Sequence, residues 1–329
     1  MRAWLLDDLT GIGSLRLAEM PDPIPQQGEA ILRVHYASLN PADRYLAERQ
    51  YPAKPALPHI LGRDGLGTVE RLGPGVTLLQ PGDRRTILRG EVGVTRPGTF
   101  AERVAVPVDH LVEIPAGWSE PEAASAPLVH LTAYQALTMW GALPPDSLTL
   151  VTGASGGVGV AAVQLARAMG HKVIALSRSE EKRRRLRELG VMTTFDPEDP
   201  DWWRAAKAAI APRRVDLAID NIGGKLLPDV IELLGNLAKV SVVGRLAGPV
   251  PEFNTATLFF RRIRIGGVAV GAWTSAESRA AWEQVLRLLS SMDARPLVDS
   301  VFPFGDLAKA FGRLAQGPMG KVVVAVAGG

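Results

Sequence analysis

The stretch LTLVTGASGGVGVAAVQLARAMG, residues 148–170, combines an apolar run, a glycine cluster and a helical pattern. The apolar run at 148–152 predicts a buried strand, and the residues from Val158 onward predict a helix. Glycines between them let the backbone turn sharply and approach a ligand, and the first N–H groups of a helix attract anions. This unit therefore predicts a dinucleotide site that holds a pyrophosphate. The residues assigned to it are Ala154, Ser155, Gly156, Gly157, Val158 and Gly159.

Two other enzyme classes use a similar turn, and the order of residues along the chain excludes both. Gly153, Ser155 and Gly157 match the nucleophile elbow of a hydrolase, which needs an acid and then a histidine downstream. His171 is the one histidine after Ser155, and no Asp or Glu lies between them. A short-chain dehydrogenase needs a tyrosine after the turn. All four tyrosines precede it: Tyr36, Tyr45, Tyr51 and Tyr134.

Length and composition bound the remaining choices. A chain of 329 residues with 47% hydrophobic and 22% charged residues fits a globular protein of two domains. The net charge is +3 and the arginines are scattered, so we expect no nucleic-acid partner. The absence of cysteine excludes disulfides, thiolate metal sites and cysteine nucleophiles. The sequence has neither an apolar run long enough to span a membrane nor the pattern of a signal peptide, so we expect no membrane partner and a cytoplasmic location.

The chain before the glycine turn is rich in proline, glycine and short strand-like runs. Turn signals such as PDPIPQQGE and QPGD separate these runs, which predicts a barrel-like, all-β segment over residues 1–120. Helical spacing then predicts one or two helices within 121–140. The strands are expected at 2–6, 15–18, 29–37, 67–72, 84–88 and 100–107.

Strands and helices alternate from residue 148 onward. This alternation predicts a doubly wound parallel sheet of the Rossmann type. A further strand at 264–270, a helix at 276–291 and a closing strand at 321–326 complete the chain. The alternating strands are expected at 172–176, 215–220 and 239–243, and the helices at 179–189, 201–210 and 225–234.

Several motifs in this order resemble the medium-chain dehydrogenase/reductase superfamily, and within it the zinc-free quinone oxidoreductase branch. They are Asn40-Pro41-Ala42-Asp43, the LGRDGLG run at 61–67, the PGDR run at 81–84, the LTAYQAL run at 131–137 and the GKVV run at 320–323. The resemblance covers the whole chain. It implies an α/β protein with a Rossmann domain at 121–265 and a β-rich, GroES-like catalytic domain formed by 1–120 and 266–329.

The resemblance also bears on the metal. Zinc-dependent members supply a cysteine near residue 40, a His-Glu pair after a glycine and a later Cys or Asp. The corresponding residues here are Asn40 and Gly62-Arg63-Asp64, and an arginine offers no lone pair to a cation. We therefore expect no metal, and packed and hydrogen-bonded roles for His59 and His130. Arg63 is expected to pair with Asp64; binding of an acidic substrate group is the alternative.

The end of the second strand indicates which nucleotide binds. An NAD site usually places an acid there, about 20 residues beyond the glycines, to accept from the ribose 2′-OH. This chain has Ser177 and Arg178 instead, with Lys182 one helical turn further on. A hydroxyl and two cations suit a 2′-phosphate, which favours NADPH. Glu180 and Glu181 nearby keep open the alternative that these cations are only solvated charges.

The resemblance implies further contacts with the cofactor. Lys321 matches a position that approaches the cofactor phosphates from the other domain; a charge that begins an edge strand is the alternative. The remaining positions carried over are Thr132, Asn221, Val243 and Gly244.

Without a metal or a nucleophile, the hydride must pass from NADPH to an electrophilic small molecule, either a quinone or an α,β-unsaturated carbonyl. The resemblance places Asn40, Tyr45 and Tyr51 in the nicotinamide pocket, and the loops at 44–58 and 246–258 around the acceptor. An enoyl-thioester or 2-alkenal reductase, and a non-catalytic NADPH-binding protein of the crystallin or sensor kind, remain alternatives. The apolar run at 263–270 resembles an edge strand that relatives pair in a homodimer.

Overall fold

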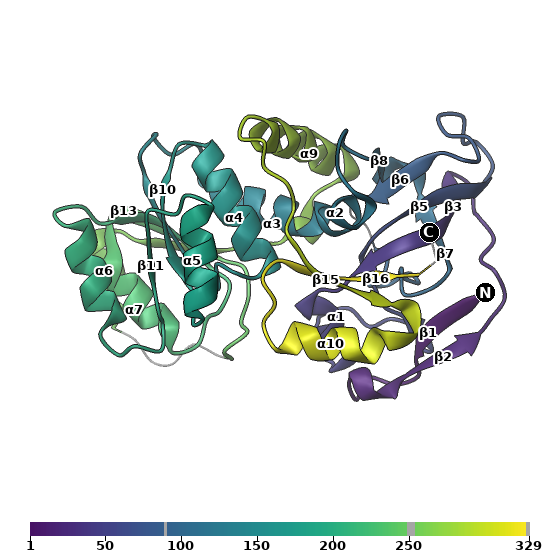
Figure 1. Ribbon diagram of the computed structural model, residues 1–329, viewed down its shortest axis with the longest axis horizontal. Helices are drawn as coiled ribbons and strands as arrows, with labels where there is room; N and C mark the ends of the chain where they lie inside the picture. Colours follow the sequence, from purple (N-terminus) through teal and green to yellow (C-terminus); the bar gives the residue numbers. More distant parts are fainter. Residues whose placement is uncertain (89–90, 249–253, 327–329) are drawn as a thin grey trace. The chain divides into compact units, whose positions relative to one another are not determined.

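The computed structural model describes residues 1–88, 91–248 and 254–326. The chain divides into two compact units (Figure 1). Unit 1 comprises Met1–Leu128, Trp273–Trp282 and Arg295–Gly329, and unit 2 comprises Val129–Ala272 and Glu283–Ala294. Of the domain boundaries expected from the sequence, the one at residue 120 lies a few residues before the long segment of unit 2, and the one at residue 266 lies a few residues inside it. The short segment Glu283–Ala294 was expected in the catalytic domain but belongs to unit 2.

Unit 2 contains a parallel sheet whose described strands follow the order β11-β10-β9-β12-β13-β14. Each neighbouring pair is parallel. The first strand in sequence, β9, lies in the middle, and the chain winds outward from it in both directions, which confirms the Rossmann-type doubly wound sheet. The strands are β9 (Leu148–Val151), β10 (Lys172–Leu176), β11 (Thr193–Phe195), β12 (Val215–Asp220), β13 (Leu234–Val242) and β14 (Arg264–Gly267).

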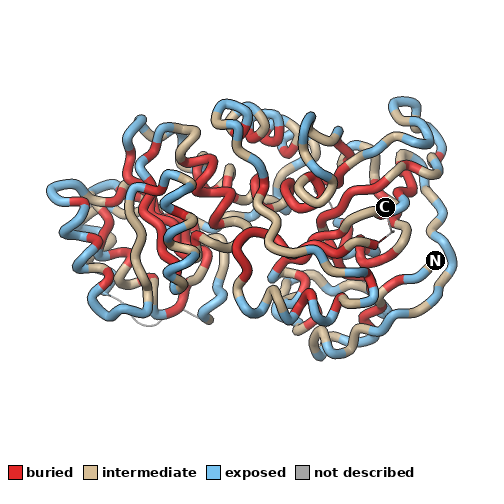
Figure 2. Tube along the Cα trace, in the orientation of Figure 1, coloured by how far each residue is buried: buried red, intermediate tan, exposed pale blue. Residues whose placement is uncertain are grey.

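Helices of unit 2 bury apolar side chains at helical spacing against this sheet. In α6, Trp202, Ala206 and Ile210 recur every fourth residue and are buried. They join Leu150 and Ile174 of the sheet in one hydrophobic core, and the strands form the buried centre of the unit in Figure 2. The helices are α3 (Pro127–Thr138), α4 (Gly157–Ala168), α5 (Glu180–Glu188), α6 (Trp202–Ile210), α7 (Leu226–Leu233) and α8 (Ala256–Arg261).

Unit 1 is β-rich, as expected for the GroES-like domain. In its larger described sheet the order is β15-β16-β3-β5-β6-β8, and β7 also pairs with β3. A smaller sheet has the order β2-β1-β4. The strands are β1 (Arg2–Leu6), β2 (Leu15–Glu19), β3 (Glu29–Ser38), β4 (His59–Ile60), β5 (Asp64–Leu72), β6 (Arg84–Ile87), β7 (Arg103–Pro107), β8 (Leu111–Glu113), β15 (Val298–Pro303) and β16 (Lys321–Ala325).

The pairing of β16 with β3 determines what lies at the site. These strands are antiparallel, with Val323 opposite Ser38, so Lys321 at the start of β16 lies beside the residues that follow β3. The same unit contains α2 (Glu120–Ser125), the first half of α9 (Ser275–Ser290) and α10 (Leu307–Ala315). Phe100 packs edge-on against Phe311 of α10, with ring centroids 5.9 Å apart.

Several local predictions were incomplete. The expected loop at 44–58 begins inside a helix, α1 (Pro41–Ala47), and the tail contains β15 and α10. The strand expected at 264–270 ends at Gly267, because a 3-10 turn follows at Val270–Ala272. Part of the loop expected at 246–258 lies outside the described residues.

Candidate functional site: a glycine turn and a buried charge cluster

The glycine turn of unit 2 joins β9 to α4, as predicted. Gly153 has a φ of +56°, and a Cβ there would lie 2.8 Å from Ile222 Cδ1. A Cβ on Gly159 would lie 2.3 Å from Gly153 O. Both positions therefore require glycine. Gly156 precedes α4 and provides no side chain to cap its first N–H groups, which leaves these donors for an anion.

The turn is fixed to the end of β12 by side-chain hydrogen bonds. Thr152 Oγ1 donates to Asp220 Oδ1 (2.8 Å) and accepts from Asn221 N (2.9 Å), and Asn221 Nδ2 donates to Thr152 O (2.8 Å). β9 and β12 flank the point where the strand order reverses, the place at which ligands bind in such sheets. Asp220 was not identified from the sequence, although it ends the strand next to the predicted Asn221.

Two acceptors at this edge are buried and lack a hydrogen-bond partner among the described residues. They are Asp220 Oδ2 and Asn221 Oδ1. A buried acceptor without a donor costs about 1–3 kcal/mol, which a ligand that supplies hydroxyl or amide hydrogens would recover. These atoms fit the ribose hydroxyls or the carboxamide of a nicotinamide nucleotide.

The end of β10 carries the residues predicted to select the nucleotide. Ser177 is buried and its Oγ lies 3.3 Å from Ser155 Oγ. The turn after β9 and the end of β10 are therefore adjacent. Arg178 is exposed and pairs with Glu198 at 3.4 Å. Arg183, which sequence reasoning did not select, donates to the carbonyl oxygens of Ser177 (2.7 Å) and Arg178 (3.0 Å). It fixes the backbone from which Arg178 projects.

The other cofactor positions predicted for unit 2 follow β9 and β13 or lie on α3 and α5. Ala154 N donates to Leu176 O (3.0 Å), which joins the turn to β10. Val243 and Gly244 follow β13 and both donate their N–H groups to Asp220 O, at 2.8 and 3.2 Å. Thr132 is half-buried on α3, and Lys182 lies in the first turn of α5.

A second cluster of polar residues is buried in unit 1. Asn40 follows β3, Asp64 begins β5, and these two strands pair with each other. Lys321 lies at the start of β16, which also pairs with β3. The ammonium of Lys321 donates to Asn40 Oδ1 (2.6 Å), Leu39 O (2.9 Å) and Asp64 Oδ2 (3.3 Å). Asn40 Nδ2 also donates to Asp64 Oδ2 (2.9 Å). Because all three ammonium hydrogens have acceptors in unit 1, contact of Lys321 with a cofactor phosphate stays a prediction.

Arg63 extends this cluster to Tyr51. Its Nη1 donates to Tyr51 Oη (3.0 Å), and its guanidinium carbon lies 4.3 Å from the centroid of the tyrosine ring. Its Nε lies 3.5 Å from Asp43 Oδ1, and Asp43 Oδ2 accepts from Asn40 N (2.8 Å). The expected pairing of Arg63 with Asp64 was wrong, because Lys321 is the cation that pairs with Asp64. Tyr45 is half-buried on α1.

Burial shifts the pKa values of the charged groups in this cluster. It raises the pKa of Asp43 to about 6, against the opposing attraction of Arg63 and the hydrogen bond from Asn40. Burial also raises the pKa of Asp64 and lowers that of Lys321, while the attraction between these two groups acts in the opposite sense. Two carboxylates and two cations thus balance one another in an almost fully buried cluster.

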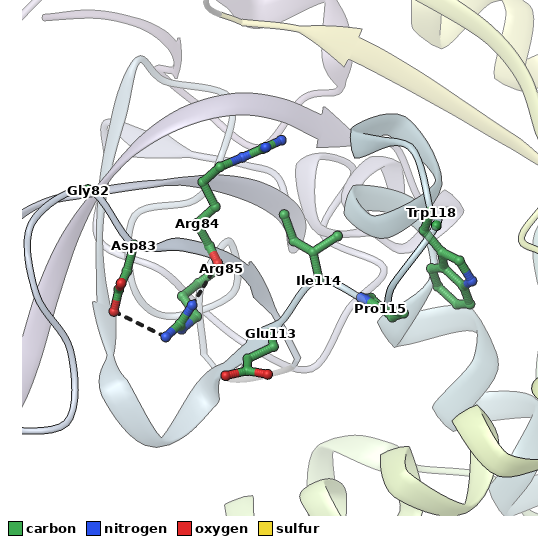
Figure 3. A pocket seen from close by; sticks show the side chains of 9 residues that line it. Gly82, Asp83, Arg84, Arg85, Glu113, Ile114, Pro115 and Trp118 are labelled. Atoms are coloured by element: carbon green, nitrogen blue, oxygen red, sulfur yellow. Dashed lines mark hydrogen bonds and ion pairs between the residues drawn. The ribbon is translucent and has the colours of Figure 1, made fainter.

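A surface pocket of unit 1, of about 500 Å³, is lined by none of these predicted site residues (Figure 3). Within it Asp83 pairs with Arg85 at 3.1 Å, and Arg85 Nη1 donates to Arg84 O at 2.9 Å. The PGDR motif therefore has a structural role in the turn that leads into β6. The pocket is lined by Gly82, Asp83, Arg84, Arg85, Glu113, Ile114, Pro115, Gly117 and Trp118.

Comparison with known proteins identifies the family. The model described as "Alcohol dehydrogenase GroES-like domain" matches residues 26–116, and "Zinc-binding dehydrogenase" matches 157–291. The quinone oxidoreductase of Lama guanicoe is 30% identical over 98% of this chain and 97% of its own. The chain belongs to the quinone oxidoreductase branch of the medium-chain dehydrogenase/reductase superfamily. The human quinone oxidoreductase is 28% identical over the same shares of the two chains.

Solved structures of this superfamily share the whole fold. A structure described as an NAD-dependent alcohol dehydrogenase is 31% identical, has a TM-score of 0.91 and matches 99% of this chain and 100% of its own. A mycobacterial protein complexed with NADPH is 25% identical, has a TM-score of 0.88 and matches the same shares. As a member of this superfamily, the chain is a pyridine-nucleotide-binding oxidoreductase with a small-molecule substrate. In the described part of the chain, no helix has the length and apolar character needed to cross a bilayer.

The zinc implied by the name of one family model does not fit the donors of unit 1. The positions expected to ligate zinc hold the Asn40 amide, the Arg63 guanidinium and the Asp64 carboxylate, with the Lys321 ammonium bonded among them. Among the described residues, no group of three or more His, Asp or Glu side chains is placed to hold an ion. His130 instead pairs with Gln164, at 3.2 Å between Nε2 and Oε1, as a packed, hydrogen-bonded histidine.

Proposed function

We propose that this protein is an NADPH-dependent, metal-independent reductase of quinones or α,β-unsaturated carbonyl compounds. The observation that carries the proposal is the buried cluster of Asn40, Asp64 and Lys321, which holds a cation of the chain itself among the residues that would otherwise bind zinc. Without a Lewis acid to polarise an alcohol or a simple carbonyl, the acceptor must already be electrophilic.

Residues of unit 2 would bind the nucleotide, and residues of unit 1 would contact the acceptor. NADPH, when bound, supplies the hydride. The turn at 153–159 and the acceptors on Asp220 and Asn221 orient the nucleotide, and Tyr51 provides a donor for the oxygen on which negative charge develops. Asn40, whose amide donates to Ser38 and Asp64, supports the site from within unit 1. The reduced acceptor gains one hydride and one proton, so a hydroquinone or a saturated carbonyl compound is released.

The preference for NADPH is supported by the charge at the end of β10. Ser177 occupies the position at which an acid would accept from a ribose 2′-OH, and Arg178 projects into solvent beside it. A 2′-phosphate would meet a hydroxyl and a guanidinium there. The comparisons leave this choice to experiment, because relatives of both nucleotide types match the fold.

A homodimer is also part of this proposal. β14 is the last strand in the order of the unit 2 sheet, and its residues are mostly exposed. An uncovered edge strand pairs readily with a second copy. Sedimentation of the protein as a single 35.2 kDa species at micromolar concentration would contradict the dimer.

The activity is tested by following NADPH oxidation with 1,4-benzoquinone, 9,10-phenanthrenequinone and a series of 2-alkenals. Quinone turnover that persists after treatment with a chelator is the expected result. Turnover confined to 2-alkenals or enoyl thioesters would exclude quinones as the acceptors and leave α,β-unsaturated carbonyl compounds. NADPH binding without oxidation across the panel would contradict the reductase function.

A further inference from the structure

The contact between Arg63 and Tyr51 determines which of the two side chains donates the hydrogen bond between them. The guanidinium meets the tyrosine at two points, by the hydrogen bond of 3.0 Å from Nη1 to the phenol oxygen and by the position of its carbon 4.3 Å from the ring centroid. A guanidinium has donors and no acceptor. The phenol oxygen therefore accepts from Arg63, and the hydrogen of the phenol must be donated to another group.

Arg63 is itself held in place from the other side. Its Nη2 donates to Ala42 O (3.4 Å), and its Nε faces the fully buried carboxylate of Asp43 at 3.5 Å. Asp43 in turn accepts from Asn40 N (2.8 Å), at the start of α1. Contacts thus run without a break from Asn40 through Asp43 and Arg63 to the hydroxyl of Tyr51.

These contacts argue against a role of Arg63 as a ligand for an acidic substrate. The side chain of Arg63 is only 10% exposed, and its two terminal nitrogens already donate to Tyr51 and Ala42. A substrate carboxylate would have to displace these contacts and leave the Asp43 carboxylate buried without its cation, which is costly. A role that keeps the contacts intact is favoured.

We propose that Arg63 is a positioning residue that directs the hydroxyl hydrogen of Tyr51 at the oxygen of the acceptor. The inference rests on the proposed reductase function. When the hydride adds to the acceptor, the O–H bond of Tyr51 breaks and its proton forms a new O–H bond on the acceptor oxygen. The phenolate left behind lies beside the Arg63 guanidinium, which balances its charge until solvent returns a proton.

The test is a double-mutant cycle on quinone or enone reduction with Tyr51→Phe, Arg63→Gln and the double variant. Because a positioned acid contributes about 10²-fold or more, Tyr51→Phe should lower kcat by about 100-fold with little change in KM. Arg63→Gln should lower kcat as well. In the Tyr51→Phe background it should change kcat by less than about twofold, because it acts through the tyrosine. Arg63→Lys, which lacks the planar fork, should restore little.

A second measurement, by NMR, detects the contact between Arg63 and Tyr51 without turnover. The chain has four tyrosines, so protein labelled with ¹³C at tyrosine Cζ gives few NMR signals, and Tyr51→Phe identifies that of Tyr51. Arg63→Gln should shift this signal and leave the others in place. Arg204, whose guanidinium carbon lies 5.0 Å from the ring centroid of Trp203 on the surface of unit 2, provides the control. Arg204→Gln should alter neither the Tyr51 signal nor kcat.

The outcomes separate this inference from the proposed function. If the parent protein oxidises no NADPH with any acceptor, both the function and the donor role are wrong. If the parent turns over but Tyr51→Phe retains its kcat, or if Arg63→Gln and Tyr51→Phe effects on kcat simply multiply, only the role of Arg63 is overturned. An unmoved Tyr51 signal in folded Arg63→Gln would overturn it as well.

Discussion

Lys321 and Asn40, 281 positions apart in the sequence, are joined by a hydrogen bond of 2.6 Å from the ammonium to the side-chain amide oxygen. The bond closes unit 1, because it links β16, near the end of the chain, to the start of α1. It also orients the amide: with Oδ1 accepting from Lys321, Nδ2 is free to donate to Asp64.

Removal of the Lys321 ammonium should destabilise unit 1 strongly. Lys321→Met leaves the buried Asp64 carboxylate without its cation, and breaking such a pair from one side costs about 3–5 kcal/mol. Urea unfolding measures the loss. Asp64→Asn added to Lys321→Met should recover part of it, since the uncompensated charge is then gone.

A surface lysine provides the control for this experiment. Lys309 pairs with Asp306 at 2.8 Å, but its side chain is 72% exposed. Lys309→Met should cost at most about 1 kcal/mol. Equal losses for the two lysine variants would show that burial of the Lys321 pair has no energetic consequence.

The raised pKa of Asp43 should make the free energy of unfolding depend on pH. Burial raises this pKa from 3.8 to about 6 in the folded state, so the folded protein binds a proton that the unfolded chain releases. The stabilising contribution is fully present below pH 3.8 and is lost as the pH rises through about 6. Relative to Asp43→Asn, the parent should therefore gain about 2 kcal/mol in free energy of unfolding as the pH falls from 7 to 4.

Asp8 tests whether this direction of the pH dependence is specific to the buried carboxylate of Asp43. Hydrogen bonds from the Thr10 side chain and backbone lower the pKa of Asp8, which is on the surface. The difference between the parent and Asp8→Asn should therefore change in the opposite direction as the pH falls. If the Asp43→Asn difference is constant from pH 7 to pH 4, the raised pKa of Asp43 is wrong.

The sequence predicted the Rossmann-type sheet well, because its signals are local. Apolar runs such as 172–176 and 215–220 coincide with β10 and β12, and the turn between β9 and α4 requires glycine at Gly153 and Gly159. Motif order along the chain was sufficient to identify the family. Short elements such as α1 and β15 were missed, because they are stabilised by contacts with distant segments rather than by a pattern of their own.

The buried cluster shows what sequence reasoning could not supply. Asn40, Asp64 and Lys321 were each singled out, but their proximity depends on the pairing of β3 with β5 and β16, which no local pattern determines. For the same reason Arg63 was assigned to its sequence neighbour Asp64 instead of Asp43. Arg183 and Asp220 act through contacts with backbone and turn, and had no motif to mark them.

Two glycines of the turn should separate folding from nucleotide binding. A Cβ on Gly159 would lie 2.3 Å from Gly153 O, whereas a Cβ on Gly156 would lie 3.5 Å from the same oxygen, an ordinary contact. Gly159→Ala should therefore lower the free energy of unfolding by about 1–3 kcal/mol and abolish tight binding. Gly156→Ala should unfold like the parent but bind NADPH more weakly, because its methyl group lies beside the first N–H groups of α4.

Thermal unfolding and fluorescence titration with NADPH measure these two effects separately. Parent-like affinity in Gly156→Ala would place the pyrophosphate elsewhere. Parent-like stability in Gly159→Ala would contradict the close backbone approach within the turn.

Arg178 should contribute to affinity for NADPH and not to that for NADH. Its guanidinium is exposed at the end of β10, and loss of a charge-assisted hydrogen bond to a 2′-phosphate costs about 1.5–3 kcal/mol, or about 10- to 100-fold in Kd. Arg178→Ala should weaken NADPH by this factor and leave the Kd of NADH within about twofold. Arg184 is a matched control, since it is similarly exposed on α5 and pairs with Glu188. If Arg178→Ala weakens both nucleotides equally, or if Arg184→Ala has the same effect on NADPH, the end of β10 does not read the 2′-phosphate, and the preference for NADPH loses its structural basis.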